Sequence, residues 1–320
     1  MIRLATIGTS TITSQFVAAL PQVPGIRLAG VFSRDRVRAA ATAKGLGAAE
    51  SWSELEAMLA STDVDAVYVA SPNVVHYAQC RAALDAGKHV FVEKPAVVTV
   101  AEFEDLLGLA RDRRVILFEG MRSAYDPGMD LVRHLLPEVG TIRRISFEYC
   151  QRSSRYDRVL AGQPVNIFDP AMAGGALNDL GVYCVSALVD LFGEPSRVAA
   201  AKVTVASGAD GAGSALATYA DCVAELAYSK ITASDRPSQV EGELGTLTID
   251  KIAEPTRIGL RLGSAPVQEH VVEKPAGNLA YEVERFVRLV AAGADPAPDQ
   301  QRTLMTLRTM ERIRTAADRL

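Results

Sequence analysis

The first 120 residues alternate short apolar runs with helix-length amphipathic segments, and no other feature of the sequence constrains the fold as strongly. The apolar runs are nearly unbroken and rich in Val, Ile and Ala, which is typical of strands buried on both faces. We expect these strands at residues 3–7, 26–32, 66–70, 90–92 and 115–118. The pattern therefore predicts a parallel, doubly wound α/β sheet for residues 1–120.

Helical periodicity fills the intervals between these runs. We expect helices at residues 14–20, 35–44, 53–59, 76–86 and 101–111. Gly45 and Gly87 follow two of them, in the position where glycine commonly ends a helix.

After Gly120 the rhythm changes to longer alternating strands that are grouped together. We expect strands at residues 141–150, 197–205, 215–220, 222–231, 238–243, 246–249 and 258–262, and helices at 174–192, 279–292 and 302–320. Strands grouped in this way predict an α+β domain with a large, mostly antiparallel sheet over residues 121–320. No long linker separates the two domains, which favours a shared cleft.

The composition excludes several classes of protein. A hydrophobic fraction of 48% with 22% charged residues is that of a globular protein with a sizeable core. A net charge of −4 gives no basic face for nucleic acid, and no apolar run approaches the roughly 18 residues of a membrane span. The cysteines lie far apart without a C-x-x-C pair, and no two histidines lie within one helical turn. We therefore expect neither a metal site nor a disulfide framework, and a cytoplasmic protein without an export signal.

The segment Ile7-Gly8-Thr9-Ser10-Thr11-Ile12-Thr13 follows the first expected strand, where a dinucleotide-binding chain carries G-x-G-x-x-G. Of the three glycines of that motif only the first, Gly8, is present here; Ser10 and Thr13 stand in place of the second and third glycines. Gly8 fits the tight turn, the Ser10 hydroxyl is able to donate to a phosphate, and the helix N-terminus offers free amides to a pyrophosphate. We predict that Gly8, Ser10, Thr11 and Ile12 bind the cofactor, although the loop alone fits a plain capped turn equally well.

The second expected strand ends at Ser33 and Arg34, where an NAD-binding chain places Asp or Glu on the ribose 2′-hydroxyl. Ser33 is able to hydrogen-bond a 2′-phosphate, and Arg34 is able to pair with it and stack on adenine. This strand end predicts a preference for NADP(H), with NAD(H) possible. A solvated Ser-Arg pair stays open as an alternative because Asp35 follows immediately.

Three further segments occur in a fixed order: Ser71-Pro72-Asn73-Val74-Val75-His76, Ala86-Gly87-Lys88-His89-Val90-Phe91-Val92-Glu93-Lys94-Pro95 and Gly174-Gly175-Ala176-Leu177-Asn178-Asp179-Leu180-Gly181-Val182-Tyr183. In this order and spacing they resemble the Gfo/Idh/MocA oxidoreductase family, which includes glucose-fructose oxidoreductase, inositol dehydrogenases and dihydrodiol dehydrogenase. The resemblance covers essentially the whole chain. It implies a Rossmann domain followed by the α+β domain, an NAD(P)-dependent dehydrogenase or reductase, and a homo-oligomer (dimer or tetramer) formed through the outer face of the second sheet.

The resemblance also assigns roles to residues. It implies that Lys94, Asp179 and Tyr183 are catalytic. It implies a cofactor site that includes Ser71, Pro72, Asn73, His76, Glu93 and Lys94. Tyr183 stands where inositol dehydrogenases have His and is similar to the glucose-fructose oxidoreductase and dihydrodiol dehydrogenase branch, which argues against inositol-type substrates.

Hydride transfer from an alcohol needs a base for the hydroxyl proton and a positive charge that stabilises the developing alkoxide. We expect Tyr183 to be the base and Lys94 to favour its phenolate, because a nearby opposite charge favours the ionised form. Asp179 lies on the same helical face as Tyr183 and would orient Lys94 or hold a substrate hydroxyl. The alternatives are that Tyr183 only fills a domain interface, that Asp179 pairs with a surface arginine, and that His76 only caps its helix.

The remaining candidates lie around this centre. Glu93 is expected to position the nicotinamide ribose, and Arg122 to face the cleft beside the cofactor. The polar loop 151–163 is the candidate substrate wall, with Tyr156 and Asn166 as contacts, although a flexible solvated loop fits it nearly as well. A second Glu-Lys-Pro-Ala, at residues 273–276, lies outside any βα unit and is expected to be a connecting loop.

Together these features predict an NADP(H)-preferring oxidoreductase that acts on a hydroxyl-bearing carbon of a sugar, polyol or diol. One alternative is a non-catalytic NAD(P)-binding regulator on the same scaffold, since fold does not dictate function. Another is an enzyme that uses the cofactor transiently during hydrolysis or elimination.

Overall fold

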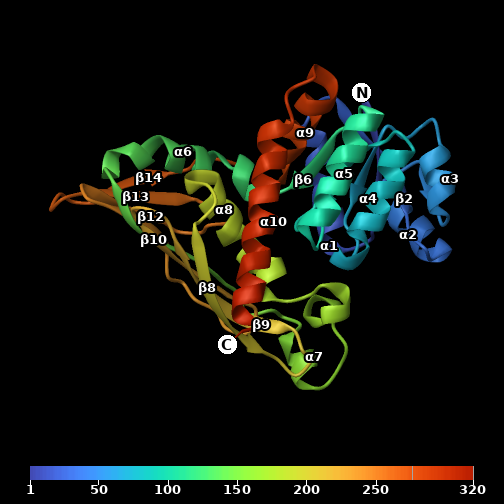
Figure 1. Cartoon of the computed structure of the whole chain (residues 1–320). Helices are drawn as coiled ribbons and strands as arrows, with labels where there is room; N and C mark the ends of the chain where they lie inside the picture. The colour runs from blue at the N-terminus through green and yellow to red at the C-terminus, as the bar shows by residue number, and fades with distance from the viewer. Residues whose placement is uncertain (276, 320) are drawn as a thin grey trace. The chain divides into compact units, whose positions relative to one another are not determined.

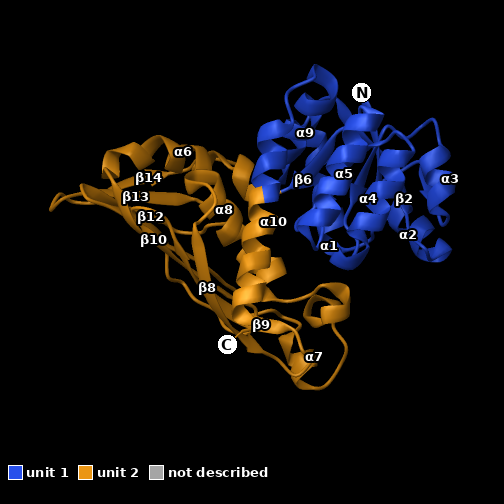
Figure 2. Ribbon diagram, viewed as in Figure 1, with its two compact units in different colours: residues 1–120, 279–304 blue, residues 121–278, 305–320 orange. Residues whose placement is uncertain are grey.

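The computed structural model describes residues 1–275 and 277–319, which form two compact units, blue and orange in Figure 2. Unit 1 comprises Met1–Gly120 and Leu279–Leu304, and unit 2 comprises Met121–Asn278 and Met305–Leu320. Of the predicted segments, the loop 273–276 and the helix 302–320 each include one residue, Ala276 and Leu320, that lies outside the described part.

Unit 1 is built on a six-stranded parallel sheet in the order β3-β2-β1-β4-β5-β6. The strands are β1 (Ile2–Ile7), β2 (Ile26–Phe32), β3 (Glu50–Trp52), β4 (Ala66–Val69), β5 (His89–Glu93) and β6 (Leu117–Gly120). The predicted Rossmann sheet is confirmed, and the strand order reverses between β1 and β4, which is where such sheets bind their ligands. The sequence missed only β3, which is three residues long and largely exposed.

The helices of unit 1 lie between and after these strands (Figure 1). They are α1 (Thr11–Ala19), α2 (Arg36–Leu46), α3 (Leu55–Ala60), α4 (His76–Asp85), α5 (Val100–Arg113), α9 (Leu279–Ala292) and the first part of α10 (Ala297–Ala317). Gly45 does not end α2, contrary to the prediction. The helix continues to Leu46, and Gly47 is the left-handed C-cap with φ +70°.

The segment 279–304 was assigned from the sequence to the second domain, whereas the structure places it in unit 1. Its helix α9 packs beside α1 and buries Val283, Phe286 and Leu289. The Phe286 ring lies 5.3 Å from that of Phe91 in β5. The sequence of an amphipathic helix shows that one face is buried, but it does not show which sheet covers that face. Periodicity alone therefore did not reveal that residues 279–304 pack in unit 1.

Unit 2 is built on an eight-stranded sheet in the order β14-β13-β12-β11-β7-β10-β9-β8. The strands are β7 (Ile142–Cys150), β8 (Arg197–Thr204), β9 (Asp210–Thr218), β10 (Val223–Ser229), β11 (Ser238–Gly242), β12 (Gly245–Ile249), β13 (Arg257–Leu262) and β14 (Gln268–Val271). Only β7 and β10 pair in parallel among these neighbours. The predicted large, mostly antiparallel sheet is confirmed.

One face of this sheet is covered by helices. A π-helical turn (Leu177–Gly181) continues directly into α8 (Val182–Phe192), which packs on β7 and β10. The helix α6 (Pro127–Leu135) packs on β12 and β13 and was not predicted. The predicted polar loop 151–163 contains a short helix, α7 (Tyr156–Leu160).

The sequence-based statement that no apolar run approaches membrane-spanning length needs correction. Among the described residues, the segment Pro170–Phe192 is long and apolar enough to cross a membrane, but 78% of its apolar window is buried inside the protein. That burial is typical of a core helix.

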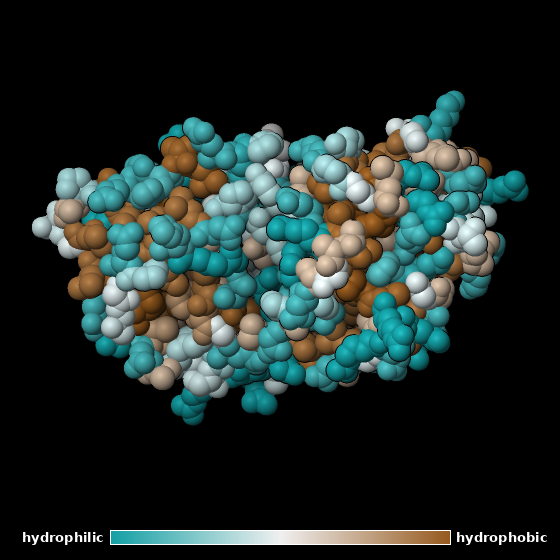
Figure 3. Space-filling view, turned by 90° about the horizontal axis from the view of Figure 1, so that it is seen from above, coloured by the Kyte–Doolittle hydropathy of each residue, from teal (hydrophilic) through white to brown (hydrophobic). Residues whose placement is uncertain are grey.

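On the face seen in Figure 3, hydrophobic side chains lie interspersed among hydrophilic ones.

Candidate active site

The turn after β1 has the geometry of a phosphate-binding loop. Gly8 adopts φ +125°, and a Cβ at this position would lie 2.5 Å from the carbonyl oxygen of Ala70, so only glycine fits. Ser10 is the extended N-cap of α1 but makes no capping hydrogen bond with its side chain, and the first turn holds no acidic residue. The start of α1 therefore keeps its dipole available to an anion, and these residues fit a pyrophosphate.

The end of β2 carries Ser33 and Arg34, and the first acid after them is Asp35. Asp35 caps α2, because its carboxylate accepts a hydrogen bond from the backbone N–H of Arg38 at 3.0 Å. Its own N–H donates to the Ser33 hydroxyl at 3.3 Å. Arg34 is exposed beside them. The nearest acid is thus engaged in helix capping, whereas Ser33 and Arg34 remain the residues at the strand end.

The segment after β4 is fixed by a buried histidine. Ser71 donates a side-chain hydrogen bond to Gln79 at 2.6 Å. The two ring nitrogens of His76, which is fully buried, lie 2.9 Å from the carbonyl oxygen of Ser71 and 3.1 Å from that of Pro95. Burial lowers the pKa of His76 despite these contacts. His76 therefore joins the chain after β4 to the chain after β5, and neither ring nitrogen points to solvent. Pro72 and Asn73 lie between Ser71 and His76 in the sequence.

The strand β5 ends at Glu93 and Lys94 follows it; the Lys94–Pro95 peptide bond is cis. The Glu93 carboxylate is buried and accepts a hydrogen bond from the hydroxyl of Tyr68 in β4 at 2.5 Å. Tyr68 was not singled out from the sequence, because its place in an apolar run gave only the expectation of a core residue.

A second buried carboxylate, Glu119 in β6, supports the chain beyond Lys94. It accepts hydrogen bonds from the N–H of Ala96 at 2.9 Å and from the hydroxyl of Thr303 at 2.9 Å. Burial raises the pKa of Glu119, while these hydrogen bonds and the charges of Arg302 and Lys94 oppose that rise. The sequence gave no indication of this role.

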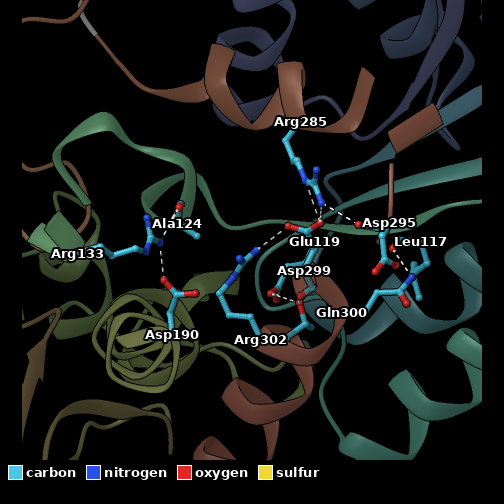
Figure 4. A network of polar contacts seen from close by, with 11 residues as sticks. Leu117, Glu119, Ala124, Arg133, Asp190, Arg285, Asp295, Asp299, Gln300 and Arg302 are labelled. Atoms are coloured by element: carbon cyan, nitrogen blue, oxygen red, sulfur yellow. Dashed lines mark hydrogen bonds and ion pairs between the residues drawn. The ribbon is translucent and has the colours of Figure 1, made fainter. Parts of the chain in front are cut away.

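The start of α10 holds further polar contacts around Glu119, shown in Figure 4. Arg285 of α9 points to Asp299 and donates to its carboxylate at 2.7 Å. Gln300 donates to the carbonyl oxygen of Leu117 in β6 at 3.2 Å. The segment that returns to unit 1 thus closes the polar network at the end of β6.

In unit 2, two glycines allow the candidate catalytic helix to begin where it does. A Cβ on Gly174 would lie 2.5 Å from the carbonyl oxygen of Asn166, and one on Gly175, at φ +138°, would lie 1.9 Å from the Asp210 carboxylate. Asp210 in turn accepts from the N–H of Leu177 at 2.7 Å. The sequence suggested that this glycine pair lets the helix approach the cofactor; within unit 2 it makes room for the protein's own loop and carboxylate.

Asp179 lies in the π-helical turn and is paired with a buried lysine. The Lys230 ammonium is 2.6 Å from the Asp179 carboxylate and also donates to the carbonyl oxygen of Ile167 at 3.0 Å. The side chain of Lys230 is 2% exposed and that of Asp179 is 38% exposed. Periodicity did not identify Lys230, although a lysine at the end of an apolar strand is an unusual residue that could have been noticed.

Tyr183 lies in the first turn of α8 and is 6% exposed. Its ring lies 5.5 Å from the ring of Tyr149 in β7, edge to face. The guanidinium of Arg122 lies 5.7 Å from the centre of the Tyr183 ring. Arg122, predicted beside the cofactor, therefore lies in unit 2 with the candidate catalytic tyrosine.

The candidate substrate wall is a packed structure rather than a loose loop. Tyr156 lies in α7, and its ring is 5.7 Å from that of Phe168. Phe168 forms a small hydrophobic cluster with Val159 and Val165, while Asn166 is exposed next to it. Across residues 1–275 and 277–319, no group of three or more His, Cys, Asp and Glu side chains could hold a metal ion.

The predicted residues fall into two sets. Those of unit 1 follow parallel strands at their carboxyl ends, where α/β sheets bind nucleotides. Those of unit 2 lie on or beside one helical segment, and Asp179 and Tyr183 are four residues apart on it. A Rossmann sheet together with a second unit that carries candidate acid–base residues is typical of nicotinamide-dependent oxidoreductases.

Comparison with known families agrees with that class. Residues 2–121 match the oxidoreductase family with an NAD-binding Rossmann fold, and residues 132–248 match the GFO/IDH/MocA C-terminal domain. The chain belongs to the GFO/IDH/MocA oxidoreductase family, as its motifs predicted.

Similar proteins span nearly the whole chain. It is 37% identical to a scyllo-inositol 2-dehydrogenase (NADP(+)) of Bacillus subtilis, covering 98% of this chain and 96% of that one. It is 30% identical to a D-xylose 1-dehydrogenase (NADP(+)) of Haloferax volcanii, covering 98% and 96%. A 3-ketoreductase from Actinomadura kijaniata, solved with TDP-benzene and NADP, has a TM-score of 0.85 at 26% identity, covering 98% of this chain and 97% of that one. These relatives are named dehydrogenases and reductases, which confirms the prediction of an enzyme.

Proposed function

We propose that this enzyme transfers a hydride between NADP(H) and a hydroxyl-bearing carbon of a sugar or cyclic polyol. The observation that carries the proposal is the pair of Asp179 and Tyr183 on one helical segment, in a chain where Lys94 directly follows strand β5 of the Rossmann sheet. A regulator that only binds the cofactor would not need an acid–base pair of this kind.

The preference for NADP(H) is supported by the end of β2. The strand end itself carries Ser33 and Arg34, and the acid that follows them, Asp35, caps α2. Ser33 and Arg34 remain, and a guanidinium recognises phosphate well. Two relatives named as NADP(+)-dependent and one solved with NADP agree with this preference.

A nicotinamide bound by unit 1 would supply hydride-transfer chemistry, and side chains of the protein would bind and release the proton of the substrate hydroxyl. Tyr183 accepts the proton of the substrate hydroxyl, and the Lys94 ammonium stabilises the negative charge that develops on the oxygen. Asp179 accepts a hydrogen bond from a substrate hydroxyl. Gly8, Ser10, Thr11 and Ile12 hold the pyrophosphate at the start of α1.

Further residues of the proposed cofactor site come from the loops after β4 and β5. These are Ser71, Pro72, Asn73 and Glu93, with His76 holding the two loops together from behind. Arg122 is proposed to act beside Tyr183 rather than on the dinucleotide, because its guanidinium lies over that ring. Tyr156 and Asn166 are the proposed substrate contacts.

The substrate is proposed to be a sugar or a cyclic polyol because the relatives are named for such molecules. The sequence-based argument against inositols rested on Tyr183 alone. A relative named for scyllo-inositol matches 98% of the chain at 37% identity, so we keep inositols among the candidate substrates.

We also propose a cytoplasmic homo-oligomer. All four cysteines are free thiols, which fits a reducing compartment. The outer face of the unit 2 sheet has a hollow of about 510 Å³ lined by small residues that include Ala199, Ser214 and Ala227, with Leu216 exposed at 45%. A face of this kind fits a second copy of the chain, which sedimentation equilibrium would test.

The test of function is a panel of sugars, inositols and diols with NADP(+) and NADPH, followed at the nicotinamide absorbance. We expect turnover with at least one polyhydroxylated compound. The variant Lys94→Ala is expected to lose about 10²- to 10⁴-fold in kcat, a typical effect of removing one proton-transfer or charge-stabilising group. Cofactor affinity, read by quenching of the single tryptophan, Trp52 in β3, should change far less. If no compound of the panel changes the nicotinamide absorbance although NADPH binds, the alternative of a non-catalytic NADP(H)-binding regulator would be favoured.

A further inference from the structure

Lys230 is a buried lysine that does not belong to the predicted catalytic set. Lys230 follows the last residue of β10 and is one of the largest fully buried side chains of the protein. Its ammonium is 2.6 Å from the Asp179 carboxylate, 3.0 Å from the Ile167 carbonyl oxygen and 4.7 Å from the centre of the Phe168 ring. A buried ammonium is costly unless it is paired and hydrogen-bonded, and here three different groups meet it.

The carboxylate of Asp179, the partner of Lys230 in this ion pair, is partly exposed to solvent. Asp179 is 38% exposed, and its backbone N–H is fixed by a hydrogen bond to the Gly175 carbonyl oxygen at 3.2 Å. A carboxylate has about four acceptor sites, and the exposed part of this side chain can be reached by a hydroxyl group from outside the protein. An ammonium this close favours the ionised form of Asp179.

Lys230 also reaches the candidate substrate wall. The Ile167 carbonyl oxygen that accepts from its ammonium belongs to the turn between Asn166 and Phe168. One side chain therefore holds both a candidate catalytic carboxylate and the turn that presents Asn166. A change at Lys230 should move the two together.

We propose that Lys230 is a positioning residue for substrate recognition. It fixes the ionised carboxylate of Asp179 as an acceptor for a hydroxyl of a polyhydroxylated substrate, and it fixes the Asn166 turn beside it. This proposal rests on the proposed function, since it requires that Asp179 meets the substrate. It predicts that substrates with several hydroxyls depend on Lys230 more than a simple alcohol does.

Two other charged residues, Asp210 and Arg314, lie near this helical turn and are left unchanged in the variants. Asp210 of β9 accepts from the N–H of Leu177, and burial raises its pKa. Arg314 of α10 donates to the Asn178 side chain at 2.9 Å. Neither group is altered in the variants, so changes in the pH profile report on the Lys230–Asp179 pair.

The main variant is Lys230→Met, which keeps the length of the side chain and removes its charge. We expect KM for the polyol to rise about 10- to 100-fold, the typical worth of a hydrogen bond to a charged group. The acid limb of kcat/KM should move upward in pH, because Asp179 loses the ammonium 2.6 Å away that favours its ionised form. The NADPH affinity read at Trp52 should stay at the parent value, and Lys230→Arg should restore part of KM.

The matched control is Lys251→Met, which removes an exposed lysine of the same unit. It should leave KM and the pH profile at parent values. If Lys230→Met changes only the melting temperature, with KM and the acid limb unchanged, Lys230 is structural and the proposal fails. A loss of NADPH affinity as large as the loss in KM would overturn it as well.

A readout without turnover separates this proposal from the proposed function. We expect Lys230→Met and Asp179→Asn to be coupled, so that the double variant of the full-length protein is less destabilised at neutral pH than the sum of the single variants. The coupling should vanish in acid, where the carboxylate is protonated. Coupling without turnover on any substrate would reject the proposed function alone; turnover without coupling would reject the role of Lys230 alone.

Discussion

Gly8 offers the sharpest test of how the phosphate loop is built, because two separable costs meet at this residue. Its φ is +125°, a conformation that side-chain-bearing residues rarely adopt. A Cβ would also lie 2.5 Å from the Ala70 carbonyl oxygen and 2.8 Å from its carbon, and both belong to backbone that follows β4 and cannot turn aside. Gly8→Ala therefore introduces both backbone strain and a collision.

The size of each cost follows from these two observations. The strained conformation costs about 1–3 kcal/mol. Overpacking against fixed backbone costs about 1–3 kcal/mol more. We expect Gly8→Ala to lower the free energy of unfolding of unit 1 by about 3–5 kcal/mol, a large part of the ordinary stability of a domain.

Gly47 is the matched control, because it also has a positive φ, +70°, but nothing lies within 4 Å of its Cβ position. Gly47→Ala should therefore show the strain alone, about 1–2 kcal/mol. Gly47 ends α2 on the side that leads to the start of β3, whereas the phosphate loop lies at the carboxyl ends of the strands, so Gly47→Ala should keep the parent affinity for NADPH. Gly8→Ala should weaken that affinity at least about tenfold, which corresponds to about 1.4 kcal/mol.

Urea unfolding followed by fluorescence measures these effects in unit 1, since the only tryptophan of the chain, Trp52, lies there. Quenching of the same residue gives the affinity for NADPH. Equal destabilisation by the two alanines would show that the close approach of Ala70 is not a constraint. Parent-like NADPH binding by Gly8→Ala would refute the assignment of this turn to the pyrophosphate.

Two further predictions concern unit 1. Ser33→Asp places a carboxylate at the end of β2, so NADPH should bind about 10- to 100-fold more weakly while NADH binds as well or better; unchanged preference in Trp52 quenching would reject this cofactor assignment. Hydrogen bonds from Arg3 lower the pKa of Asp65 to about 2, so this carboxylate stabilises the fold above its ordinary pKa near 4 and loses that effect as the pH falls toward 2. Because its side chain is 35% exposed, Asp65→Asn should cost only about 1 kcal/mol at pH 7 and almost nothing near pH 2; a cost independent of pH in urea titrations would contradict this.

The sequence predicted most elements correctly because hydrophobic periodicity reports burial directly. The unbroken runs of β2 and the alternation of β7 were both recognised within one residue of their observed ends. Periodicity failed where burial is incomplete, as in β3, or where the decisive quantity is a backbone angle. Gly45 and Gly47 illustrate the second case: both are glycines near one helix end, and only the position of the left-handed residue decides which one is the cap.

The candidate site was predicted unevenly for a related reason. Motifs identified Lys94, Asp179 and Tyr183, but they did not identify the partners that hold them. Lys230 lies 136 residues beyond Lys94 and 51 residues beyond Asp179 in the sequence. It reaches Asp179 only because β10 lies against the helical segment in the folded unit. Pairing between distant segments is a property of the fold, so a single sequence does not reveal it.

The partners that were missed have one feature in common, and it suggests where such groups should be sought. Glu119 lies in β6 and Lys230 lies directly after β10, each within or at the end of a largely apolar strand. Burying a charge there is unfavourable unless the fold supplies hydrogen bonds, and both residues obtain them from segments far away in the sequence. A charged residue that interrupts the end of an apolar strand is therefore itself evidence for a polar partner inside the fold. In this enzyme it points to the residues that hold the loop after Lys94 and the carboxylate of Asp179.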